Sequence, residues 1–136
     1  MNNLSRNVIG LIMFLSIPAS AVSDDSKLAV EIVSPDDGGK VGHRPFIEGL
    51  VSKPSAEVWV VIHPLAVSQY WVQPRVTVRP DSGKWKVKVY VGDPSSKGLF
   101  EIRAVANPKI KLKEGMKLEN WPETSAISNV VEVQRK

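Results

Sequence analysis

The chain has 136 residues, with 18 lysines and arginines against 14 aspartates and glutamates, a formal net charge of +4, and no cysteine. The absence of cysteine excludes a disulfide framework and a thiol-linked lipid, and so mild a positive charge does not by itself indicate a nucleic-acid partner. The length fits one domain that is large enough to bury its own core.

The beginning of the chain has the features of a secretion signal. Arg6 lies in a short polar start, residues 8–19 are largely apolar, and Ala19-Ser20-Ala21 fits an A-x-A cleavage site. The apolar run has about a dozen residues, whereas a membrane-spanning helix needs ~20, so a retained anchor is the weaker alternative. We expect residues 1–21 to be a cleaved signal peptide and residues 22–136 to be one exported domain, periplasmic or secreted.

The rest of the chain has the pattern of β-strands and turns. Short runs rich in Val, Ile, Trp and Tyr are bounded by Gly, Pro, Asp, Asn or Ser, and no segment keeps the apolar spacing of a long amphipathic helix. One run, residues 57–63, is nearly all apolar and is therefore expected to be covered on both faces at the centre of the core. The predicted strands, in chain order, are residues 28–33, 46–51, 57–63, 70–78, 84–91, 99–106 and 129–134.

Two of these strands predict a hairpin. In residues 84–91 apolar and polar side chains alternate strictly, which predicts one buried and one wet face, and Pro80-Asp81-Ser82-Gly83 fits a tight connection. Pro74 interrupts the preceding strand, which indicates an edge position or a bulge. The expected cross-strand pairs are Arg79 with Lys84, Thr77 with Lys86, and Arg75 with Lys88.

About seven strands at spacings near ten residues predict an all-β fold with two packed sheets. The connection from Asn107 to Ser128 is longer than the ~15 residues usual for a structureless loop, so it either contains short structure or serves a function. Its apolar residues could pin it to the sandwich; they are Ile110, Leu112, Met116, Leu118 and Trp121.

Several segments resemble the landmarks of bacterial immunoglobulin-like modules in exported proteins. They are Ile32-Val33-Ser34-Pro35-Asp36-Asp37-Gly38, Phe46-Ile47-Glu48-Gly49, the strand that contains Trp59, and Asp81-Ser82-Gly83-Lys84-Trp85. The resemblance implies an immunoglobulin-like two-sheet β-sandwich of about seven strands over nearly all of residues 22–136, with Trp59 as the core tryptophan. It implies no mechanism, because this fold hosts many functions.

No catalytic or metal motif stands out. His43 and His63 are the two histidines, and neither lies in a metal or nucleophile motif. The sequence Asp36-Asp37-Gly38-Gly39 lacks the alternating carboxylates of a calcium loop and is expected to be an ordinary turn. We therefore expect no enzymatic activity, no metal and no cofactor.

The outward face of the hairpin carries five candidate binding cations: Arg75, Arg79, Lys84, Lys86 and Lys88. They could bind an anionic glycan, a lipid head group or an acidic protein. The alternative is a solvated face that resists edge pairing, partly neutralised by Glu101. Lysines at 109, 111, 113 and 117 repeat the pattern, but the sequence does not place them relative to the hairpin.

Aromatic residues form the second group of candidates: Tyr70, Trp71, Tyr90 and Trp121. Each could be a sugar-stacking platform or a protein contact, or it could cover an end of the sandwich. Tyr70 and Trp71 are neighbours in a strand, so they are expected to point to opposite faces.

We expect a non-catalytic binding or adaptor domain that contacts another envelope or extracellular component, with a protein or an anionic glycan as partner. A carbohydrate-binding module that uses the exposed aromatic residues is the first alternative, and a small hydrolase is the second.

Overall fold

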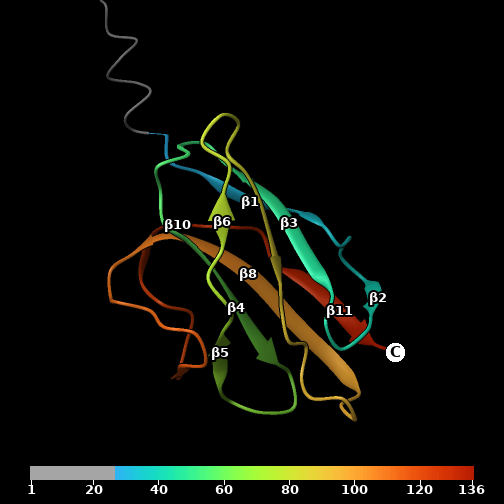
Figure 1. Cartoon of the computed structure of the whole chain (residues 1–136). Coiled ribbons are helices and arrows are strands. Elements are labelled where there is room, and N and C mark those ends of the chain that lie inside the picture. Colours follow the sequence, from blue (N-terminus) through green and yellow to red (C-terminus); the bar gives the residue numbers. More distant parts are fainter. Residues whose placement is uncertain (1–26) are drawn as a thin grey trace, which may run out of the picture.

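A computed structural model describes residues 27–136, which fold into two packed β-sheets (Figure 1). The expected signal peptide, residues 1–21, lies outside the described residues. Among those residues no helix is long and apolar enough to cross a membrane. The expected all-β, two-sheet sandwich is confirmed for this part of the chain.

The strands of residues 27–136 divide into two sheets. Sheet I has the order β1-β3-β7-β6, and sheet II has the order β2-β11-β8-β4-β5-β9, with β10 also paired to β8. The pairing of β2 with β11 is parallel, and the other pairings are antiparallel. The strands are β1 (Val30–Ser34), β2 (Gly39–Val41), β3 (Phe46–Val51), β4 (Val58–Pro64), β5 (Tyr70–Val72), β6 (Thr77–Val78), β7 (Lys84–Lys88), β8 (Gly98–Pro108), β9 (Lys117–Leu118), β10 (Thr124–Ile127) and β11 (Val131–Arg135).

The chain changes sheets between β5 and β6. β5 pairs with β4 through Val72 and Val61 in sheet II, whereas β6 pairs with β7 through Thr77 and Lys86 in sheet I. The expected single strand over residues 70–78 is therefore wrong. Proline has no N–H to donate to a ladder, and Pro74 lies in the segment where the chain leaves sheet II.

The predicted hairpin of β6 and β7 is confirmed. The backbone N–H of Arg79 donates to the carbonyl oxygen of Lys84 at 2.8 Å, which gives the expected register. Gly83 ends the connection with φ of +77°, and a Cβ atom there would lie 2.2 Å from the carbonyl oxygen of Val51. Glycine satisfies both constraints because it has no Cβ.

The main core lies between the two sheets and is built by strand alternation. On β4, Val58, Val60 and Ile62 point into it. Trp85 of β7 is the tryptophan of this core, directly opposite Gly49 of β3, where a Cβ atom would lie 2.2 Å from Cζ2 of the Trp85 ring. The indole of Trp85 therefore occupies the space that a side chain at position 49 would need.

A second apolar cluster covers the outer face of sheet II. Trp59 and Val61 point outward from β4, with a period of two, into a cluster with Val105 of β8 and Leu112. Trp59 is buried, as expected for a core tryptophan, but it belongs to this second cluster and not to the core between the sheets. The long connection lies over this cluster, and it contains β9 and β10, so it is packed structure.

The remaining differences concern short strands and strand ends. β1 begins at Val30 and β11 at Val131, each two residues after the predicted start, and β8 ends at Pro108, two residues after the predicted end. β2, β9 and β10 were not predicted, because strands of two to four residues are too short to show an alternating pattern. β7 ends at Lys88, three residues before the predicted end, yet Val89 and Val91 remain buried.

Candidate functional site

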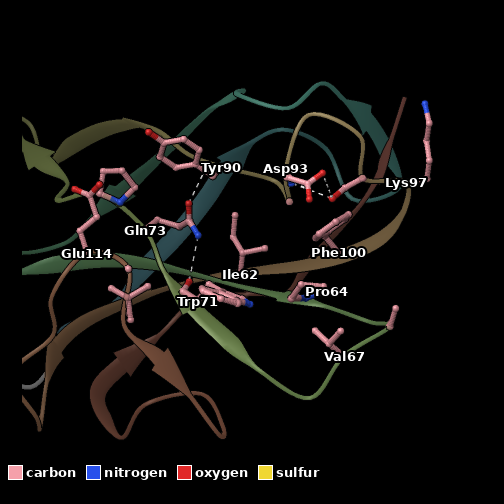
Figure 2. A pocket seen from close by; sticks show the side chains of 16 residues that line it. Ile62, Pro64, Val67, Trp71, Gln73, Tyr90, Asp93, Lys97, Phe100 and Glu114 are labelled. Atoms are coloured by element: carbon pink, nitrogen blue, oxygen red, sulfur yellow. Dashed lines mark hydrogen bonds between the residues drawn. The ribbon is translucent and has the colours of Figure 1, made fainter.

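A cleft of about 670 Å³ opens between the end of β4, β5 and the connection from β7 to β8 (Figure 2). We call it the aromatic cleft. Its volume is within the range of ~300–1,000 Å³ that is usual for ligand pockets. Its lining includes Ile62, Val67, Trp71, Gln73, Pro74, Tyr90, Asp93, Lys97, Glu114 and Gly115.

Two aromatic side chains stand on opposite walls of the aromatic cleft. Figure 2 shows Tyr90 on one wall and Trp71 on the other, with Gln73 and Ile62 between them. The side chain of Trp71 is 37% exposed and that of Tyr90 is 43% exposed. Both rings therefore keep accessible surface inside a concave site.

Each of these rings has a cation against it that does not line the cleft. The guanidinium carbon of Arg44 lies 3.7 Å from the centroid of the Tyr90 ring, and Nζ of Lys117 lies 5.3 Å from that of Trp71. Arg44 is itself fixed by a hydrogen bond from its Nε to the carbonyl oxygen of Val89, at 3.0 Å. Such contacts contribute ~0.5–1 kcal/mol each at exposed sites and hold the rings in place.

Gln73 links the two walls. Its Nε2 donates to the carbonyl oxygen of Trp71 at 3.2 Å, and its Oε1 accepts from the backbone N–H of Tyr90 at 2.8 Å. Its side chain is buried, with 4% exposure. Because one buried amide joins β5 to the segment after β7, it sets the spacing between the two aromatic walls.

The loop at the far end of the cleft carries an ionised carboxylate. Hydrogen bonds from the hydroxyl and backbone N–H of Ser95 and from the hydroxyl of Ser96 hold the pKa of Asp93 below its ordinary value. The buried guanidinium of Arg135, on β11, donates to the carbonyl oxygens of Val91, Asp93 and Pro94. These bonds tie the loop to sheet II.

His63 supports the loop on the other side of the cleft. Its Nε2 lies 2.9 Å from the carbonyl oxygen of Val67, which lines the cleft, and its Nδ1 lies 3.1 Å from Oε1 of Glu101. Its ring stacks on Tyr70 at 4.0 Å between centroids, and Tyr70 meets Trp121 at 4.8 Å. Tyr70 and Trp121 therefore pack in the second apolar cluster, whereas Trp71 faces the cleft.

Arg75 does not continue the basic row of the hairpin, and the expectation that it faces Lys88 is wrong. The pairing of β6 with β7 covers Thr77 with Lys86 and Val78 with Trp85 and does not include Arg75. The guanidinium carbon of Arg75 lies 5.9 Å from the centroid of the Trp59 ring, on sheet II. The cause is the change of sheet before β6. Arg75 instead lines a hollow of about 620 Å³ with Lys109, Lys111 and Lys113. We call this the cationic hollow.

The other four hairpin cations remain on the outer face of sheet I. Lys84, Lys86 and Lys88 are exposed at alternate positions of β7. Glu48 lies directly opposite Lys86, so it neutralises part of the row. Glu101, which was expected in that role, is hydrogen-bonded to His63 on sheet II. The fourth cation, Arg79, forms an exposed ion pair with Asp81 at 3.3 Å.

The candidate residues of the sequence thus fall into four places: the aromatic cleft, the second apolar cluster, the cationic hollow and the outer face of sheet I. Gln73, Asp93 and Arg135 were not among the predicted site residues. An arginine that continues the buried alternation of Val131 and Val133 was a usable signal for Arg135. No comparable signal marks Gln73 or Asp93, because their partners are set by the tertiary fold.

No protein-family model matches this chain, and no curated protein sequence matches it. Among solved structures, one similar chain comes from a structure described as "Structural basis of T cell specificity and activation by the bacterial superantigen toxic shock syndrome toxin-1". The two chains are 9% identical and align with a TM-score of 0.43, over 81% of this chain and 100% of the other. A similarity this distant carries no argument about function, so the site rests on its own geometry.

Proposed function

We propose that this chain is a non-catalytic, exported binding domain and that the aromatic cleft binds a carbohydrate. The observation that carries the proposal is the pair of accessible rings, Trp71 and Tyr90, on facing walls of one cleft, each held by a cation from outside it. Pre-positioned rings lose little conformational entropy when a ligand binds.

The composition of the cleft suits a sugar. A sugar ring has apolar C–H faces, which pack on the face of an aromatic ring, and hydroxyl groups around its edge, which need hydrogen-bonding partners. Trp71 and Tyr90 supply the faces, while Asp93, Lys97 and Glu114 supply charged groups at the border. One oxygen of Asp93 takes all three serine bonds, which leaves the other for a ligand hydroxyl.

The same residues support binding over hydrolysis. Glycoside hydrolysis uses a carboxylic acid whose pKa is raised, so that it can protonate the leaving oxygen. The serine bonds lower the pKa of Asp93 instead. The ring nitrogens of His63 face Oε1 of Glu101 and the carbonyl oxygen of Val67 and do not point into the cleft as a free base.

We also propose that the sandwich is of the immunoglobulin type. The order β1-β3-β7-β6 corresponds to strands A-B-E-D of such domains, and β11-β8-β4-β5 corresponds to G-F-C-C′. An experimental structure with another strand order would contradict this assignment.

Export is proposed from the sequence of residues 1–21. Mass spectrometry of the protein made in a host with a secretion system should give a chain that starts at Val22. A product that keeps Met1 would contradict cleavage.

The function is tested with a glycan panel and the variant Trp71→Ala. We expect the unaltered domain to bind at least one glycan and Trp71→Ala to lose about fivefold to a hundredfold in affinity, because a stacking contact of ~1–3 kcal/mol is removed. Phe46→Ala is the matched control, since it removes an aromatic side chain that is 49% exposed on the outer face of sheet I. It should bind as the unaltered domain does.

Equal affinities of the unaltered domain and Trp71→Ala would move the site away from the cleft. Absence of binding to every glycan would overturn the carbohydrate proposal. Thermal unfolding of each variant checks that the fold is retained.

A protein partner on sheet I is the second candidate function. The outer face of sheet I exposes Phe46 and Leu50 beside the three lysines of β7. The Nζ atom of Lys86 lies 4.4 Å from the centroid of the Phe46 ring. An acidic protein with an apolar centre fits this surface. Crosslinking in the cell envelope should then attach a reproducible protein through Lys84, Lys86 or Lys88, and Phe46→Ala should abolish it. Crosslinks that persist in Phe46→Ala would argue against this face.

A further inference from the structure

We infer that the ligand is an acidic glycan, whose sugar rings occupy the aromatic cleft while its carboxylate or sulfate groups lie in the cationic hollow. This inference rests on the proposed function and adds to it the chemical class of the ligand. It is carried by the composition of the hollow, by the absence of ion pairs between its four cations and any of residues 27–136, and by its continuity with the cleft.

The cationic hollow gathers charge from two distant parts of the chain. Arg75 comes from the segment that crosses between the sheets, and Lys109, Lys111 and Lys113 come from the long connection. Glu57 and Glu114 also line it, so four cations face two carboxylates. The Oε2 atom of Glu57 accepts a hydrogen bond from the indole N–H of Trp59, which orients this carboxylate toward the ring.

The four cations form no ion pairs within the part of the chain that the structure describes. None of them forms an ion pair or a side-chain hydrogen bond with any of residues 27–136; the one close contact is that of Arg75 with the Trp59 ring. Like charges gathered around one concavity repel one another, and an anion in the concavity relieves that repulsion. This arrangement favours an anionic ligand.

The hollow and the aromatic cleft are neighbours. Glu114 lines both, and Pro74, which lines the cleft, directly precedes Arg75, which lines the hollow. The buried side chain of Leu112 fixes the connection between them against sheet II. A linear glycan can therefore extend from the rings of the cleft across the Pro74 and Glu114 border into the hollow.

An acidic glycan uses both sites at once, whereas a neutral glycan uses the cleft alone. Ion pairs with exposed lysines contribute little each, so the charged groups add to the affinity from the stacking contacts and do not replace it. The binding should also weaken in salt, because the Debye length falls from ~30 Å at 0.01 M to ~3 Å at 1 M.

The experiment compares uronate oligosaccharides with their methyl esters, which keep the sugar rings and remove the charge. The probes are oligomers of galacturonate, glucuronate-containing hyaluronan, and alginate. We expect at least one acid form to bind about tenfold more tightly than its ester at low salt, and the difference to disappear at high salt.

Two triple variants locate the effect. Lys109→Gln/Lys111→Gln/Lys113→Gln should lose about tenfold in affinity for the acid form, so that it binds the acid no better than the ester. Its affinity for the ester should equal that of the unaltered domain. Lys84→Gln/Lys86→Gln/Lys88→Gln removes the same number of charges from sheet I. It should keep the preference for the acid, which separates a local site from an effect of net charge.

The outcomes distinguish the two proposals. If ester and acid bind equally and Trp71→Ala abolishes both, the carbohydrate cleft stands and the acidic ligand is overturned. If the two lysine variants lose affinity for the acid equally, the hollow is overturned as its site. If no probe binds and no neutral glycan of the panel binds, the proposed function falls together with this inference.

Discussion

The outer faces of the two sheets differ in what covers them. On sheet I, β3 and β7 follow a strict alternation, and the outward positions carry Lys84, Lys86 and Lys88 beside Phe46 and Leu50, all exposed. On sheet II, the outward positions of β4 and β8 include buried apolar side chains, which the long connection covers. The outer face of sheet I is exposed to solvent, whereas that of sheet II is apolar and is covered by the long connection.

The long connection from Asn107 to Ser128, which we call the cover, does more than bury apolar surface. Its residues Glu114 and Gly115 line the aromatic cleft, and Lys109, Lys111 and Lys113 line the cationic hollow. The apolar outer face of sheet II therefore has a functional consequence: the segment that it holds in place supplies walls to both proposed subsites. The difference between the two faces predicts where substitutions should matter.

The largest effect is expected beneath the cover. Leu112→Ala should lower the free energy of unfolding by about 2–4 kcal/mol, since it leaves a cavity under the long connection. The amides of Val72 and Gly115, which bond across this connection, should lose hydrogen-exchange protection more than those of the main core. Uniform loss of protection over the whole domain would show that the cover has no separate stability.

A smaller effect is expected at the link between the cleft walls. Gln73→Ala should cost about 1–3 kcal/mol in unfolding free energy, because it leaves the buried N–H of Tyr90 without its partner. It should also weaken glycan binding without removing any ring.

Gln134→Ala is the control for Gln73→Ala, because Gln134 is exposed on β11. Its effect should stay within about 0.5 kcal/mol. If Gln73→Ala keeps full glycan affinity, the spacing of the walls does not depend on this amide.

The uncovered face should tolerate substitution. Leu50→Thr on β3 should change the unfolding free energy by less than about 0.5 kcal/mol, since its side chain is already in contact with solvent. Chemical denaturation of this variant beside Leu112→Ala tests the comparison directly. Equal losses in the two variants would mean that the outer face of sheet I is also covered in solution.

The smallest effect is expected in the pH dependence of stability, through the carboxylate of Asp93. The pKa of Asp93 is lower in the folded chain than its ordinary value of 3.8, so its carboxylate stabilises the fold above that pH, and the contribution is lost as the pH falls through the lowered pKa. In Asp93→Asn this acid-side loss should be absent. Unfolding midpoints of the two proteins, followed from neutral pH to below the ordinary pKa, should therefore converge on the acid side. If the two unfolding midpoints differ by the same amount at every pH, the serine hydrogen bonds do not lower the pKa of Asp93.

The elements with strong alternation could be predicted from the sequence. β3 has the predicted bounds, and the β6–β7 hairpin has the predicted register, because period-two patterning and a Pro-to-Gly turn are local signals. The opposite orientations of Tyr70 and Trp71 follow from the same rule and are also observed.

The candidate site could be predicted only in part. Trp71 and Tyr90 are identifiable as aromatic candidates, but their placement on facing walls depends on the chain leaving sheet II after Val72, which no local pattern specifies. The same change of sheet moves Arg75 from the hairpin to the cationic hollow. Partners that the tertiary fold brings together, such as Gln73 and Tyr90, leave no trace in a single sequence.

The most direct test of the account is an NMR titration of the indole N–H groups of the four tryptophans with a glycan that binds, each signal assigned by a Trp→Phe variant. Trp59 and Trp85 are buried and Trp121 is packed against Tyr70, whereas Trp71 lines the cleft. We predict that the chemical shift of the Trp71 indole N–H changes and reaches a plateau as the glycan is added, and that those of Trp59 and Trp85 do not change. A saturable shift at Trp121 with an unchanged signal of Trp71 would contradict it.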